Sequence, residues 1–325
     1  MMQYTRLGSS GLQVSRLALG CMELGNVQKQ PWHLNEEEGL AYIQGALARG
    51  INFFDTADVY GQGESERILG KALAKYANRN EVVVATKVYY PLDQSLNGGG
   101  LSRKHIMAAL DASLERLQMD YVDLYIIHRW DYQTPIEETM ACLNDLVKSG
   151  KVHYIGASAM YAWQFQKAQY IAKHNGWIPF ISMQNHYNLL YREDEREMIP
   201  LCQDLGVALT PYSPLAGGRL ARDWFADTKR SQLDQSAKDK YDANEPVDHE
   251  IVNRVGELAK QKGVTRAQIA LSYLLGHPQV AAPIIGGSRL THLDDAIGAL
   301  DIVLTPDERA YLEEAYQPHR IVGAL

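Results

Sequence analysis

Eight short apolar runs recur along the chain, and segments with helical periodicity separate them. The runs are rich in β-branched and aromatic residues, and several are apolar on both faces, which is typical of parallel strands covered by helices. Strands that alternate with helices form either a closed parallel barrel or an open doubly wound sheet. The count of eight favours an α/β fold of the (β/α)8 TIM-barrel type. The predicted strands are 17–20, 52–55, 82–87, 121–128, 152–157, 180–184, 207–210 and 281–285.

Helix start signals lie between these runs. Asn35 with Glu38, and Thr265 with Gln268, have the spacing of a capping box, in which a side chain at each end bonds to the other's backbone. Thr134, followed by proline at the expected first helical position, predicts another capped helix start.

The N-terminus and the length fix the expected domain organisation. Segments 3–6 and 13–16 flank the sequence Gly-Ser-Ser-Gly at 8–11 and predict an N-terminal β-hairpin. Barrels of this type take from about 200 to more than 400 residues, so we expect one domain over residues 1–325. Helical segments beyond the eighth run predict extra C-terminal helices.

One long irregular stretch, 217–248, follows the seventh predicted strand and is rich in Asp, Lys and Ser. A loop of this length in a compact domain is usually a lid or a mobile insertion. The sequence does not assign it a role.

Charge and cysteine content exclude several classes of function. The net charge is −7 and Lys and Arg form no cluster, so we expect no nucleic-acid partner. No apolar run is long enough to span a bilayer, and the first residues lack the layout of a signal peptide. Cys21, Cys142 and Cys202 are scattered and odd in number, which predicts reduced thiols in a cytoplasmic protein, without a metal site. The sequence does not predict the oligomeric state.

Ionisable residues close three consecutive predicted strands. Asp55, Lys87 and His128 end the second, third and fourth strands, and Tyr60 follows Asp55 by five positions. Taken singly, each has an ordinary explanation: a turn cap, a solvated charge, a neutral histidine and a packed ring. Because strand ends converge at the C-terminal face of such a barrel, where active sites form, we expect the four to lie together.

This set of residues is suited to carbonyl reduction. A tyrosine hydroxyl has a pKa near 10, and a neighbouring ammonium is expected to lower it. Tyr60 would then donate a proton to a carbonyl oxygen as hydride reaches the carbon. Lys87 would supply the positive charge, Asp55 would hold Lys87, and His128 would orient the carbonyl.

Seven segments then resemble the successive signatures of the aldo-keto reductases. They fall in order from Gly50 to about Ile297, and the branch they are similar to contains many bacterial enzymes and the potassium-channel β-subunits. The segments are GINFFDTADVYGQGESERILG, VVVATK, IIHRWD, GASAM, MQNHYNLL, YSPLAGGRL and PIIGGSRLTHLDDAI.

The resemblance implies a catalytic tetrad of Asp55, Tyr60, Lys87 and His128, and a bound NADP(H) with no metal. Arg289 would meet the 2′-phosphate, because a guanidinium forks onto phosphate oxygens, and this favours NADPH over NADH. The remaining residues are assigned to parts of the cofactor. They are Ser158, Gln184 and Tyr212 for the nicotinamide, Ser213, Leu215, Gly217 and Arg219 for the pyrophosphate, and Gly286, Gly287, Ser288 and Asp295 for the adenosine.

Three positions depart from the family pattern. Ala159 stands where asparagine is common, and His292 and Ala296 stand where glutamine and asparagine are frequent. These departures leave the strictness of the NADPH preference open.

Two other functions compete with a reductase. Lys87 as a Schiff-base nucleophile would give a barrel lyase or aldolase, although Asp55 argues against it by keeping the amine protonated. A redox-sensing, NADP-binding partner protein with little turnover is the second. The substrate is open between small carbonyl compounds and sugar-like molecules, with Arg129 and Asp131 among the polar residues near the expected site.

Overall fold

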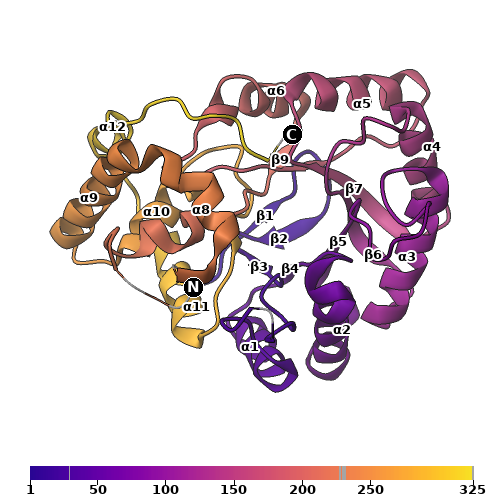
Figure 1. Ribbon diagram of the computed structural model, residues 1–325, viewed down its shortest axis with the longest axis horizontal. Coiled ribbons are helices and arrows are strands. Elements are labelled where there is room, and N and C mark those ends of the chain that lie inside the picture. Colours follow the sequence, from indigo (N-terminus) through magenta and orange to yellow (C-terminus); the bar gives the residue numbers. More distant parts are fainter. Residues whose placement is uncertain (29, 227, 229–231, 324–325) are drawn as a thin grey trace.

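The computed structural model of this protein describes residues 1–28, 30–226, 228 and 232–323. Eight parallel strands form one sheet in the order β10-β3-β4-β5-β6-β7-β8-β9 (Figure 1). Each lies within or beside an apolar run singled out above. The strands are β3 (Ala18–Gly20), β4 (Phe53–Asp55), β5 (Val83–Val88), β6 (Val122–Ile127), β7 (Val152–Ser158), β8 (Ser182–Gln184), β9 (Ala208–Leu209) and β10 (Ile284–Ile285).

The sheet closes on itself, which excludes the open doubly wound alternative. β10 pairs in parallel with β3, and Leu209 of β9 forms a parallel bridge with Val280, just before β10. Two backbone bonds of 2.9 Å seal the seam, from Leu209 N to Gln279 O and from Ala281 N to Leu209 O. The predicted (β/α)8 barrel is therefore confirmed.

Helices surround the barrel (Figure 1). The capping boxes predicted at Asn35–Glu38 and at Thr265–Gln268 are both present, at the starts of α1 and α10. A helix also follows the last strand region, as expected. The helices are α1 (Glu36–Ala48), α2 (Glu64–Tyr76), α3 (Arg103–Leu117), α4 (Ile136–Lys148), α5 (Ala162–His174), α6 (Met198–Leu205), α8 (Gln235–Tyr241), α9 (Glu245–Lys262), α10 (Arg266–Leu275), α11 (Leu290–Gly298) and α12 (Pro306–Glu313).

The predicted hairpin, β1 (Tyr4–Arg6) and β2 (Gln13–Ser15), covers the N-terminal end of the barrel. Leu7 and Val14 are fully buried and pack with apolar side chains of the strands, among them Phe53 and Leu124. The opposite end, where the strands terminate, is thereby left for the functional site.

Two local expectations were wrong. Thr134 does not cap α4, because its hydroxyl donates instead to Asp131 Oδ2 at 2.7 Å and Pro135 takes the cap position. The stretch 217–248 is not irregular throughout: it contains α8, whose start is capped by Asp234, and the first turn of α9. Residues 227 and 229–231 of this stretch lie outside the described residues.

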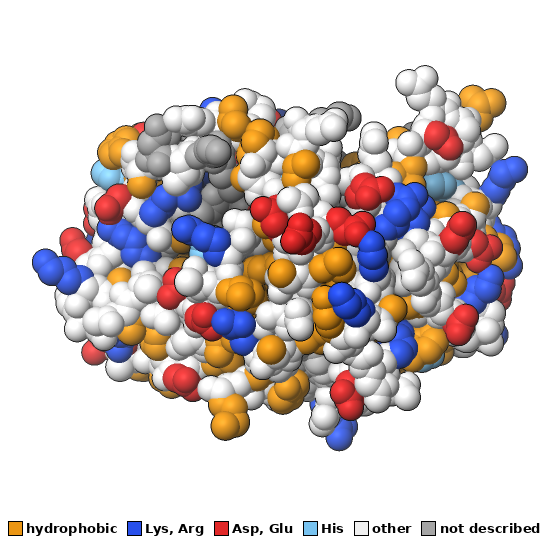
Figure 2. All heavy atoms as spheres, turned by 90° about the horizontal axis from the view of Figure 1, so that it is seen from below, with side chains coloured by type: hydrophobic (Ala, Val, Ile, Leu, Met, Phe, Trp, Pro, Cys, Tyr) orange, Lys and Arg blue, Asp and Glu red, His pale blue; other side chains and the backbone are white. Residues whose placement is uncertain are grey.

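The described part of the chain contains no helix long and apolar enough to cross a membrane. Its three cysteines are buried and free. Basic and acidic side chains are interspersed on the face shown in Figure 2, where no broad field of a single sign is visible.

Helix α2 packs closely against the end of α3 at Gly70. A β-carbon added to Gly70 would meet the backbone of Leu117 at the end of α3, closer than real β-carbons come to other atoms. Backbone cannot move aside as a flexible side chain can, so this contact demands glycine.

We therefore expect Gly70→Ala to lower the free energy of unfolding by about 2–4 kcal/mol, through overpacking. Gly45→Ala, inside α1, is the matched control: its added methyl would crowd the end of Leu290, an exposed and flexible side chain, and would reach Arg49 only at ordinary contact distance. That change should stay within about 1 kcal/mol, since alanine favours the helix. Urea unfolding of both variants measures the difference; equal losses would contradict the close-packing argument.

Candidate active site

The four residues of the predicted tetrad meet at the C-terminal ends of neighbouring strands. Asp55 ends β4, Lys87 is the penultimate residue of β5, and His128 directly follows β6. Tyr60 begins a short 3-10 turn, Tyr60–Gly63, in which Gly61 and Gln62 both have a φ of 58°. This tight turn brings the tyrosine back over the strand ends.

Lys87 is the centre of the cluster and is fully buried. Its ammonium donates to Asp55 Oδ2 at 2.6 Å, to the backbone oxygen of Thr56 at 2.7 Å and to the Tyr60 hydroxyl at 3.2 Å. An ammonium has three donors, so all three are engaged. The amine therefore has a fixed position and its positive charge points at Tyr60.

The charges in this cluster set its protonation states. Burial is the largest single effect on the pKa of Lys87 and acts to lower it, but the charges of Asp55 and Tyr60 and the hydrogen bonds to them together outweigh burial, and the pKa is raised. Burial also raises the pKa of Tyr60, while Lys87 acts in the opposite direction without overcoming burial. The expectation that the ammonium would bring this pKa below its ordinary value is therefore wrong, because desolvation of a phenolate and the nearby Asp55 charge were left out of it.

His128 is buried and neutral in this environment. Burial, with smaller effects of Lys87 and Arg129, holds the pKa of His128 far below its usual range. Its Nδ1 has no hydrogen-bond partner among the described residues. The ring lies edge-on to Tyr60, with centroids 5.8 Å apart, and to Tyr90 at 5.1 Å.

The cluster continues across the barrel to the residues expected at the nicotinamide. Gln184, at the end of β8, donates from Nε2 to Asp55 Oδ1 at 2.8 Å. Ser158, at the end of β7, donates from Oγ to Gln184 O at 2.9 Å. One carboxylate thus holds both Lys87 and Gln184, so the structure brings Gln184 and Ser158 together with the predicted tetrad.

Tyr212 belongs to an aromatic stack that sequence reasoning missed. His186 stacks on Tyr212 with centroids 5.2 Å apart and on Tyr191 at 4.2 Å, with both pairs of rings nearly parallel. His186 lies two residues beyond Gln184, and this position past a strand end was the available signal. The buried Tyr212 hydroxyl has no partner among the described residues.

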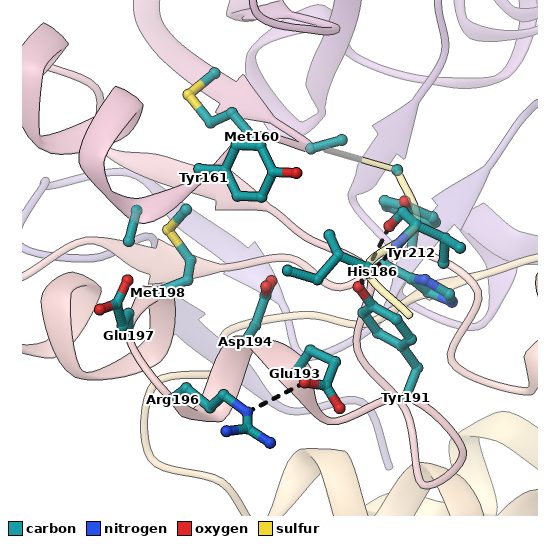
Figure 3. A pocket seen from close by; sticks show the side chains of 15 residues that line it. Met160, Tyr161, His186, Tyr191, Glu193, Asp194, Arg196, Glu197, Met198 and Tyr212 are labelled. Atoms are coloured by element: carbon teal, nitrogen blue, oxygen red, sulfur yellow. Dashed lines mark hydrogen bonds and ion pairs between the residues drawn. The ribbon is translucent and has the colours of Figure 1, made fainter. Parts of the chain in front are cut away.

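A cavity of about 380 Å³ lies beside this stack (Figure 3). Met160 and Tyr161 line one side, and the rings of Tyr191, His186 and Tyr212 line another. The C-terminal segment 321–323 closes part of it. The cavity adjoins Tyr212 and does not include the predicted tetrad.

The residues expected at the pyrophosphate follow β9. Gly217 has a φ of 65° and Ser213 a φ of 53°, so both lie in the left-handed region of a tightly turned backbone. Leu215 precedes the 3-10 turn Ala216–Ala221. Arg219 pairs with Asp242 and lies over the ring of Tyr241.

The residues expected at the adenosine precede α11, except Asp295, which lies within that helix. Gly286, Ser288 and Arg289 are exposed, and Gly287 and Asp295 are half-buried. Arg289 makes a 3.2 Å bond to His292 and has no ion pair within the described ranges. It stands at the start of a helix, where backbone N–H groups and the helix dipole favour an anion.

Of the three departures from the family pattern, Ala159 has the clearest structural effect. Its φ is 45°, a backbone conformation that asparagine adopts more readily than alanine. His292 is bonded to Arg289, and Ala296 is buried in α11.

A second buried polar cluster joins α2, β5 and α3 and was not anticipated. Glu66, fully buried, accepts from Thr86 Oγ1 and from Arg116 Nε, each at 2.6 Å. Burial, followed by the charge of Glu66, raises the pKa of the buried Asp58 to about 7. Glu66 lies in the first turn of α2, and nothing in the sequence pattern distinguished it from a solvated acid.

Removing Lys87 should expose how strongly the buried pair is coupled. Lys87→Met leaves the Asp55 charge buried without its partner, so we expect the free energy of unfolding to fall by about 3–5 kcal/mol. Combining it with Asp55→Asn, which keeps an acceptor for Gln184, should recover much of the loss. Lys71→Met, which removes an exposed pair with Glu36, should cost less than about 1 kcal/mol. A double variant less stable than Lys87→Met would contradict this coupling.

Comparison with known proteins places the chain in a family. The sequence model of the aldo/keto reductase family matches residues 16–317. Versiconal hemiacetal acetate reductase of Aspergillus parasiticus is 48% identical, covering 98% of this chain and 98% of that protein. An aldo-keto reductase of Fusarium vanettenii is 43% identical, covering 98% and 92%. A putative aryl-alcohol dehydrogenase of Saccharomyces cerevisiae is 40% identical, covering 98% of each chain.

These relatives are fungal, so the expected likeness to bacterial enzymes and potassium-channel β-subunits is not supported. The described residues contain no group of three or more His, Cys, Asp or Glu side chains arranged to hold a metal ion. The family model matches most of the chain, and the sheet forms the closed barrel. This chain is therefore an oxidoreductase that belongs to the aldo/keto reductase family.

Proposed function

We propose that this protein uses NADPH to reduce an aldehyde or ketone to the alcohol, with Tyr60 as the proton donor. The observation that carries the proposal is the 3.2 Å contact between the Lys87 ammonium and the Tyr60 hydroxyl, made while Asp55 holds the ammonium. The hydroxyl keeps its proton because its pKa is raised, and the adjacent cation favours the phenolate that forms when the proton leaves.

The other side chains orient and polarise the carbonyl group. His128 is neutral, so it can donate one hydrogen bond to the carbonyl oxygen without competing for the Tyr60 proton. Gln184 and Ser158, tied to each other and to Asp55, would hold the carboxamide of the nicotinamide. When bound, the reduced nicotinamide supplies the hydride.

NADP(H) fits the chain better than NAD(H). Arg289 has no acidic partner among the described residues and stands at the start of α11, a position suited to a 2′-phosphate. Arg219, by contrast, is engaged by Asp242, so its part in binding the pyrophosphate requires that this pair open or be shared. The cofactor preference belongs to the proposal.

The lyase or aldolase alternative is disfavoured by the state of Lys87. A Schiff base needs a neutral amine, whereas this amine has a raised pKa and three occupied donors. The redox-sensor alternative remains compatible with the same geometry. Turnover of NADPH with a panel of small aldehydes separates them: negligible turnover with tight NADP binding would favour the sensor.

The names of the relatives suggest where to look for substrates. One is named for a hemiacetal acetate and another for aryl alcohols, which makes aromatic aldehydes a sensible first panel beside small and sugar-like carbonyls.

We also propose that the protein acts in the cytoplasm, because its three cysteines are free thiols. We propose further that residues 1–325 form one domain.

Tyr60→Phe should lower kcat by about 10²–10⁴-fold, the usual contribution of a general acid. NADPH binding, followed by fluorescence titration, should be nearly unchanged. Tyr90→Phe is the matched control, since its ring also packs edge-on to His128; its turnover should stay within about threefold of the unmodified protein. Full activity of Tyr60→Phe would remove the tyrosine from the proposed role.

The pH dependence follows from the same side chains. Tyr60 donates only when protonated, and its pKa is raised above 10, so this activity is lost only as the pH rises through the raised pKa of Tyr60. His128 has a pKa far below 6.5 and stays neutral above it. We expect kcat/KM for reduction to be flat from about pH 6.5 to 9. A falling limb centred between pH 7 and 8 would contradict these protonation states.

A further inference from the structure

Arg129 is a charged side chain beside the cluster to which the mechanism above gives no role. It directly follows His128 at the end of β6 and is half-buried. Its Nη1 donates to the backbone oxygen of His128 at 2.7 Å, and its guanidinium carbon lies 5.6 Å from the centre of the Tyr90 ring. These two contacts hold the guanidinium beside Tyr90, whose ring packs edge-on against the His128 ring.

No carboxylate neutralises Arg129 within the described part of the chain. The acid nearest in sequence, Asp131, is occupied by its own loop: it accepts from Leu101 N and Thr134 Oγ1 at 2.7 Å and from Gln133 N at 2.8 Å. Asp55 is taken by Lys87 and Gln184. The guanidinium retains donors that no protein carboxylate uses, since it carries five.

The charge of Arg129 acts on both sides of the site. It lowers the pKa of Tyr60 and of His128 on the side of the tetrad, each as one of the smaller effects on that residue. The charge of Arg129 also acts to lower the pKa of Tyr212, where it is the largest influence after burial, and the pKa of His186. Arg129 is therefore a cation without a carboxylate partner among the described residues, and its charge influences both the proton donor and the predicted nicotinamide-stacking ring. Lys240 is a second cation at that ring, with its Nζ 5.1 Å from the centre of Tyr212.

We propose that Arg129 selects carbonyl substrates that carry a carboxylate. The planar fork of a guanidinium matches a carboxylate and binds it with two parallel hydrogen bonds. The inference rests on the proposed reductase function and adds the class of substrate. Because Arg129 neighbours His128, the carboxylate and the reacting carbonyl would belong to one compact molecule.

A different role for the same charge makes a different prediction. A cation beside Tyr60 and His128 also stabilises negative charge that develops on any carbonyl oxygen during reduction. In that role Arg129 would accelerate charged and neutral substrates equally and would not discriminate between them. A matched pair of substrates separates the two roles.

The test compares para-carboxybenzaldehyde with para-formylbenzamide, its neutral isostere, using the full chain and NADPH. We expect the acid to be preferred in kcat/KM, and Arg129→Gln to lower kcat/KM for the acid by about 10–100-fold, mainly through KM, as for a lost charged hydrogen-bonded pair. The amide should change by less than about threefold. Arg129→Lys, which keeps the charge but not the fork, should retain part of the preference.

Lys151→Gln is the control for loss of one positive charge. Lys151 precedes β7 at the other end of the barrel and pairs with Asp111 on the surface, so its variant should leave both substrates unchanged. In the unmodified protein the KM for the acid should rise with ionic strength and that for the amide should not.

The outcomes are distinguishable. If the protein reduces neither aldehyde and no other carbonyl compound, the proposed function is wrong, and this inference is wrong with it. Reduction of the amide without any preference for the acid, or equal losses for both substrates in Arg129→Gln, would overturn the inference and leave the reductase intact. Loss of the preference in Arg129→Gln alone, with the amide still reduced, would support it.

Discussion

The buried pair between the Lys87 ammonium and the Asp55 carboxylate is the interaction on which the site depends. Transfer of two charges out of water is costly, and close contact with additional hydrogen bonds is needed to offset it. Here the ammonium has three acceptors and the carboxylate has two donors, Lys87 and Gln184. Few arrangements satisfy all of these bonds, so the pair fixes the relative positions of β4, β5 and β8.

Asp55 also links the two halves of the site. Through Oδ2 it holds the ammonium that faces Tyr60, and through Oδ1 it holds Gln184, which receives a bond from Ser158 at its backbone oxygen. The proposed proton donor and the proposed carboxamide site are therefore positioned by one carboxylate. The side chains of Lys87 and Gln184 are thus both held by the same buried group, without solvent between them.

The sequence predicted the barrel and its polar end because both follow from periodic rules. Parallel strands that alternate with helices bring their C-terminal ends to one face of the sheet. The clustering of Asp55, Lys87 and His128 could therefore be predicted from the sequence alone. Thr134 could not be interpreted in this way, since its hydroxyl had two acceptable partners and the tertiary position of Asp131 decided between them. The pKa of Tyr60 needed burial, which no local pattern gives. Glu66 was missed because its burial and its partner Arg116, on another helix, are both set by the tertiary structure.

The two cations at this end of the barrel differ in a way that separates their functions. Lys87 is fully buried and its charge is balanced by Asp55, so it has no donor left for a ligand and acts only on its fixed neighbour, Tyr60. Arg129 is half-buried and has no carboxylate partner among the described residues. A balanced cation contributes equally to every substrate, whereas an unbalanced one contributes most to a substrate that brings the missing negative charge. Reaction chemistry and substrate choice can therefore reside in neighbouring strand ends, β5 and β6, and change independently.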